Sequence, residues 1–149
     1  MKTLVIAVLF VSSFAFAADL KPSQEEEKTA FDKQWKSILD EVNTACGTKF
    51  DAVKTDFENW DKKNFVRARA GTACSTLSYA LKEICKSAPF KKAVESKVKE
   101  LSCAFTGATT DKKNSKANFE LKGGVLTLHL DQDQGGSGAV EAIKEFLDK

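Results

Sequence analysis

The spacing of apolar residues predicts a long amphipathic helix over residues 24–46. Apolar side chains recur there every three or four positions and form one stripe, made of Phe31, Trp35, Ile38, Val42 and Ala45. The four residues from Ser23 to Glu26 fit a capping box, and Gly47 is a typical helix stop. The predicted helix therefore carries Cys46 in its last turn.

The same criterion predicts further helices along the chain. Residues 49–60 keep helical spacing, although their aromatic and β-branched side chains would also suit a strand. Residues 65–86 are expected to form a second long helix. After Pro89, residues 90–101 continue with an apolar side that includes Val98 and Leu101, and residues 139–147 form a short closing helix.

Between these helices the apolar period changes from helical to strand-like. Residues 118–122 and 125–131 flank Gly123 and Gly124, a pair suited to a two-residue hairpin turn. Such a turn places Phe119 opposite Leu128, so that one face is apolar and the other is polar. A strand over residues 101–106 is expected to complete an antiparallel sheet.

These elements predict an α+β fold. We expect three to five helices, two or three of them long, packed on one face of a small antiparallel β-meander and stapled by two disulfides.

The first 17 residues have the pattern of a cleavable signal peptide. Lys2 precedes an unbroken apolar run, and the segment ends in Ala15, Phe16 and Ala17. Because the apolar stretch of residues 4–18 is shorter than the roughly 20 residues of a membrane-spanning helix, we expect cleavage rather than anchoring. The prediction is an exported protein, periplasmic or secreted, with residues 18–149 as a single disulfide-stabilised domain.

The four cysteines are expected to form two disulfides, because their number is even and export leads to an oxidising compartment. Their positions are Cys46, Cys74, Cys85 and Cys103. In one helix Cys74 and Cys85 would lie about 16 Å apart along the axis, too far for a bridge. An antiparallel arrangement of helices 65–86 and 90–101 favours Cys74–Cys103 with Cys46–Cys85, over Cys46–Cys74 with Cys85–Cys103. Their wide spacing argues against zinc.

Charge is nearly balanced overall but unevenly distributed. Residues 62–122 hold 14 basic and 5 acidic groups, whereas both flanking segments are acidic. A basic cluster at the predicted start of the second long helix is the best candidate for binding an anionic partner, and consists of Lys62, Lys63, Arg67 and Arg69. The competing interpretation is that these lysines and arginines only solubilise helix surfaces.

The sequence offers little catalytic chemistry. His129 is the only histidine, which argues against histidine-rich metal sites, and its strand position places it on the polar face. Asp131 and Asp133 begin like a calcium loop, but Gly135 then stands at a ligand position.

Two other features have structural interpretations. The glycine-rich residues 135–138 lack the lysine of a nucleotide-binding loop and are expected to connect a strand to a helix. Trp35 and Trp60 keep step with apolar stripes and are expected in the core.

The favoured hypothesis is a non-enzymatic, exported binding protein that engages an anionic envelope polymer or another protein. The alternatives are an inhibitor of a secreted hydrolase, acting through loops such as 107–116 or 131–138, and a small hydrolase using isolated carboxylates. No catalytic residue, cofactor or metal is assigned.

Overall fold

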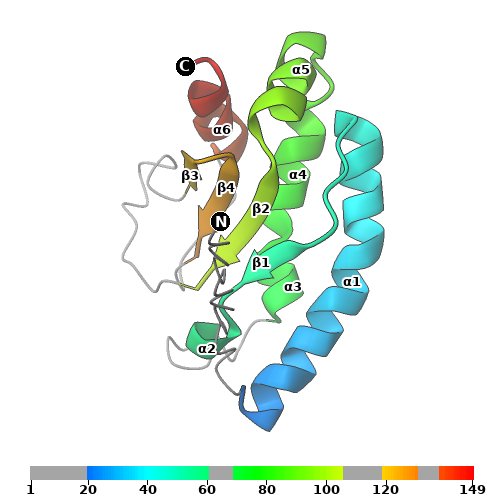
Figure 1. Cartoon of the computed structure of the whole chain (residues 1–149), viewed down its shortest axis with the longest axis vertical. Coiled ribbons are helices and arrows are strands. Elements are labelled where there is room, and N and C mark those ends of the chain that lie inside the picture. Colours follow the sequence, from blue (N-terminus) through cyan, green and yellow to red (C-terminus); the bar gives the residue numbers. More distant parts are fainter. Residues whose placement is uncertain (1–19, 61–68, 106–118, 131–137) are drawn as a thin grey trace, which may run out of the picture.

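The computed structural model describes residues 20–60, 69–105, 119–130 and 138–149, which are arranged as shown in Figure 1. The elements are α1 Pro22–Cys46, β1 Val53–Thr55, α2 Phe57–Trp60, α3 Ala70–Ala73, α4 Ser75–Ile84, α5 Ala88–Lys97, β2 Glu100–Ala104, β3 Phe119–Lys122, β4 Val125–His129 and α6 Ala139–Leu147. The fold is α+β, as predicted.

The sheet is mixed, so the predicted antiparallel meander is wrong. Its strand order is β1-β2-β4-β3, in which β2 pairs in parallel with both β1 and β4, and only β3 and β4 are antiparallel. Leu101 and Cys103 of β2 are fully buried. A buried strand needs partners for its backbone groups on both sides, and these are β1 and β4.

The hairpin prediction is confirmed. Phe119 lies opposite Leu128 and Leu121 lies opposite Leu126, on either side of a turn with positive φ at both glycines. Residues 118 and 131 of the predicted strands lie outside the described residues.

The prediction of a helix over residues 49–60 is wrong, because the segment splits at Asp56 into a strand and one helical turn. The Asp56 carboxylate accepts the backbone N–H of Phe105 at 2.6 Å, and also accepts the side-chain amide of Asn59 at 2.9 Å. The Asp56 carbonyl accepts the Asn59 N–H. Asp56 thus ends β1 and starts α2.

The helix boundaries also differ from the predicted ones. Pro22 occupies the first turn of α1, and the Lys21 N–H donates to Gln24 Oε1 at 2.9 Å, so Ser23 is not the cap. Within residues 65–86, the described part contains α3 and α4 separated at Cys74. Helix α5 ends at Lys97 because Val98 is extended, and Leu101 lies in β2.

Both disulfides join the pairs that were predicted. The Cys46–Cys85 bridge, here the α1–α4 bridge, connects the C-terminal ends of two helices. The Cys74–Cys103 bridge, here the α4–β2 bridge, ties the start of α4 to the sheet. Each bridge links two different elements, and Cys74 is not bridged to Cys85, as predicted.

The core lies between the helices and one face of the sheet. Leu101 and Cys103 of β2 share this face with Leu126 and Leu128 of β4, whereas the intervening Ser102 is only half-buried. Helix α4 contributes fully buried leucines and isoleucine to the same cluster. One core therefore connects the sheet to the helices that flank it (Figure 1).

Candidate functional site

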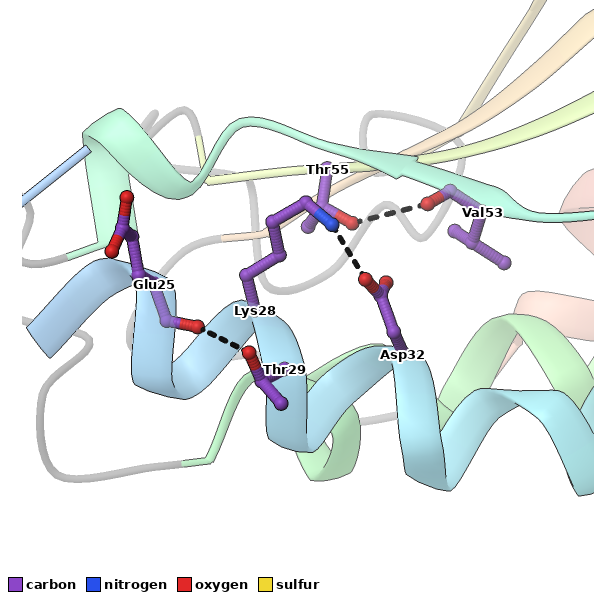
Figure 2. Close-up of polar contacts among 6 residues, drawn as sticks. All are labelled: Glu25, Lys28, Thr29, Asp32, Val53 and Thr55. Atoms are coloured by element: carbon purple, nitrogen blue, oxygen red, sulfur yellow. Dashed lines mark hydrogen bonds and ion pairs between the residues drawn. The ribbon is translucent and has the colours of Figure 1, made fainter. Parts of the chain in front are cut away.

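A groove of about 910 Å³ runs between α1 and residues 48–57 and is here called the α1–β1 groove. Its two walls run in opposite directions: Asn43 is hydrogen-bonded to Phe50 at one end, and Gln24 donates to the Glu58 carbonyl beyond the other. Figure 2 shows the same antiparallel order, with Lys28 beside Thr55 and Asp32 beside Val53. The α1–β1 groove is therefore a long surface groove whose two walls run antiparallel to each other.

The helix wall carries two parallel rows of side chains. The inner row is apolar and consists of Phe31, Trp35 and Leu39, which are buried and form the floor. The outer row is charged and exposed, with alternating sign at every fourth position: Lys28, Asp32, Lys36 and Asp40. Residues four apart lie on one face of a helix, so the sequence places both rows along the groove.

The charged row is only partly neutralised within the protein. Lys28 Nζ lies 2.5 Å from Asp32 Oδ2, and both side chains are about half exposed, so this pair adds little stability (Figure 2). Lys36 and Asp40 make no ion pair within the described residues. The second half of the row is therefore available to a binding partner.

The opposite wall is formed by β1 and the segment before it. Strand β1 lies at the edge of the sheet and, among the described strands, pairs only with β2. The Thr55 hydroxyl donates to the Val53 carbonyl at 3.3 Å (Figure 2). Edge strands present backbone N–H and C=O groups that can pair with another chain.

Asn43 holds the segment before β1 in place. Its side chain accepts the Phe50 N–H at 2.8 Å and donates to the Phe50 carbonyl at 2.9 Å. Gly47, with φ of 72°, allows the chain to leave α1 and return along it. The strand wall is thus positioned by local contacts to α1.

The indole N–H of Trp35 is buried in the groove floor without a hydrogen-bond acceptor in the described structure. The Trp35 ring stacks on Phe31, with ring centroids 5.5 Å apart. The prediction that Trp35 and Trp60 lie in the core is confirmed, since they are 1% and 7% exposed. An unpaired buried donor costs stability, so this indole N–H is a local exception in an otherwise apolar floor.

The predicted basic cluster is represented in the described residues by Arg69 alone; Lys62, Lys63 and Arg67 lie outside them. Arg69 donates to Glu27 Oε2 at 2.9 Å, and the Ala70 N–H donates to Glu27 Oε1 at 2.6 Å. Glu27 is 2% exposed, so α1 provides a buried carboxylate that caps α3. Arg69 therefore makes an ion pair within the protein, although most of its side chain is exposed.

Comparisons with protein-family models, curated proteins and solved structures found no match for this chain. Among the described residues there is no group of three or more histidine, cysteine or acidic side chains placed to hold a metal ion. Nor does any described helix have both the length and the apolar character needed to cross a membrane.

Neither His129 nor the four cysteines line the groove. His129 Nε2 lies 3.4 Å from Glu120 Oε2 on the polar side of the hairpin. The cysteines are all bridged. The aspartates of the weak calcium pattern and residues 135–137 lie outside the described residues.

The groove itself was missed by sequence reasoning. The charged row beside the Phe31 and Trp35 stripe was visible as a signal at i, i+4 spacing. This row forms a groove wall only because an edge strand lies opposite it, and the sequence analysis predicted a helix for residues 49–60 instead of that strand.

Proposed function

We propose that the protein is an exported binding protein that holds an extended polypeptide segment of a partner in the α1–β1 groove. The observation that carries the proposal is that one wall of the groove is an edge strand. A polypeptide entering there can extend the sheet through main-chain hydrogen bonds, while its side chains contact the facing helix.

The dimensions of the helix wall suit such a segment. The stretch from Lys28 to Asn43 is about 22 Å long at 1.5 Å per residue. An extended chain covers that length with about six or seven residues. The floor is apolar but closely packed, with Phe31, Trp35 and Leu39 at most 5% exposed, so recognition rests mainly on the walls. The charged rim of the helix wall has both signs, which suits a polypeptide better than a uniformly anionic polymer.

The export part of the proposal has two supports. The pattern of residues 1–17 is that of a signal peptide, and the two disulfides are typical of proteins in oxidising compartments. Binding in the periplasm or the medium is consistent with both.

Other functions have less support. The groove is lined by Asp32, Asp40 and Asp51, but all three are exposed, whereas acid–base catalysis by a carboxylate pair generally places one carboxyl group in an apolar environment. An anionic polymer would need the basic cluster, of which only Arg69 is described. Inhibition of a hydrolase would use loops 107–116 and 131–138, of which only Gly138 is described.

Selection from a random displayed heptapeptide library tests the proposal. The bait is the disulfide-bonded protein, produced from the full chain in an oxidising compartment. The blocked variant is Ala52→Trp, because Ala52 is exposed and lines the groove beside β1. The matched control is Ala88→Trp, an equally bulky change at an exposed position of α5 that does not line the groove.

We expect the unmodified protein and Ala88→Trp to enrich the same peptides, and Ala52→Trp to lose them. Each enriched peptide is also synthesised in two forms, with N-methylated backbone amides at either the odd or the even positions. Only the form that methylates the N–H groups facing β1 should lose binding, because alternate amides of a strand face its neighbour. Failure to enrich any peptide, or equal enrichment by Ala52→Trp, overturns the proposal.

A further inference from the structure

The charged row of α1 has a repeat that matches an extended chain. Residues four apart on the helix rise by about 6.0 Å. Side chains on one face of an extended strand repeat at about 6.6–6.8 Å. Over the interval from Lys36 to Asp40 the mismatch is below about 1 Å, so residues two apart on a bound strand can lie opposite this pair.

The electrostatics of the row select the signs of those two residues. Lys28 and Asp32 already neutralise each other. Lys36 and Asp40 have no ion-pair partner among the described residues, so an acidic side chain opposite Lys36 and a basic one opposite Asp40 would each gain an attractive contact. The reverse arrangement would place like charges together.

The direction of the walls converts these signs into a sequence order. Strand β1 runs opposite to α1, as the Asn43 contacts to Phe50 and Figure 2 show. A segment added antiparallel to β1, the commoner kind of strand pairing, therefore runs in the same direction as α1. It meets Lys36 before Asp40.

We infer that the groove selects an extended segment containing an acidic residue followed two positions later by a basic residue. This inference rests on the proposed function and adds the chemical class of the ligand and its direction. Main-chain pairing with β1 provides attachment beside Lys28 and Asp32. The same segment then continues along the residues that precede β1, where the Lys36 and Asp40 pair sets polarity and register.

The test compares the displayed-library selection for the unmodified protein with that for the charge-exchanged variant Lys36→Glu with Asp40→Lys. Both positions are exposed, and the exchange keeps the net charge constant. At low salt, we expect acid-x-base peptides to exceed base-x-acid peptides by about fivefold or more with the unmodified protein, and the ratio to invert with the variant. The bias should shrink in 0.5 M salt.

The same exchange at Lys33→Glu with Glu26→Lys, two exposed α1 positions that do not line the groove, is the control and should leave the ratio unchanged. Enrichment that Ala52→Trp abolishes, but that shows no charge order or fails to invert, overturns this inference while leaving the groove as the binding site. Enrichment of base-x-acid peptides by the unmodified protein overturns the antiparallel direction. Absence of any enrichment overturns the proposed function and this inference with it.

Discussion

Replacing Glu27 by alanine should destabilise the protein by about 2–3 kcal/mol. The substitution removes the acceptor of the Ala70 N–H, and Ala70 is fully buried, so this donor is left unsatisfied at a cost of about 1–3 kcal/mol. Loss of the contact to Arg69 adds at most about 1 kcal/mol, because the Arg69 side chain is 69% exposed. Relief of the buried carboxylate offsets part of the sum.

Glu27→Gln separates the hydrogen bond from the charge. Its side-chain oxygen can still accept the Ala70 N–H, while the ion pair with Arg69 is lost. We therefore expect a cost of about 1 kcal/mol for this variant and less than about 1 kcal/mol for Arg69→Ala. Glu26→Ala, at the neighbouring exposed position, is the control and should change the free energy of unfolding by less than about 0.5 kcal/mol.

Urea unfolding followed by circular dichroism gives the free energies, provided that the slope against denaturant is the same for all four variants. If Glu27→Ala unfolds with the same free energy as Glu26→Ala, the buried carboxylate does not stabilise the junction of α1 and α3. If Arg69→Ala is as costly as Glu27→Ala, the ion pair and not the N–H contact dominates.

Three further predictions concern backbone conformation and the bridges. Gly71→Ala should be neutral or stabilising by up to about 1 kcal/mol, provided that the end of the exposed Gln34 side chain, which the new Cβ would overlap, moves aside. Gly47→Ala should instead cost about 1 kcal/mol because its φ is 72°, and thermal unfolding distinguishes the two signs. Asn43→Ala should cost about 1–2 kcal/mol by releasing Phe50, and equal stability would show that these bonds add nothing. Replacing both cysteines of the α1–α4 bridge by serine should cost about 3–4 kcal/mol for its separation of 39 residues, measured by the urea midpoint; a loss below about 1 kcal/mol would contradict the loop-entropy estimate.

Patterns local in sequence predicted the structure well. The hairpin followed from period-two alternation around two adjacent glycines, so its register could be derived without tertiary information. Distance along the predicted helix excluded a Cys74–Cys85 bridge, and the expected antiparallel helix pair favoured the observed pairing. The pairing is correct although Cys103 lies in a strand and Cys74 at a helix junction.

Patterns that depend on distant partners were predicted poorly. The alternation of Leu101 and Cys103 shows which face of β2 is buried, but not that both neighbours are parallel to it. Residues 49–60 are apolar at spacings that suit a helix or a strand, and the choice depends on the contact of Asp56 with Phe105, 49 positions away. The α1–β1 groove was missed for the same reason. The charged row of α1 can be read as a groove wall only when residues 53–55 are known to form a strand opposite it.

The two bridges divide the described structure into parts that should open at different rates. They connect α1, α4 and β2, and neither includes a residue of the segment from Thr48 to Trp60. That segment contains the three-residue strand β1 and one helical turn, so its amides should exchange with solvent through local opening, well below the free energy of global unfolding. A segment bound along β1 would add a second ladder and slow this exchange, so that amide protection at Lys54 and its neighbours would report occupancy directly.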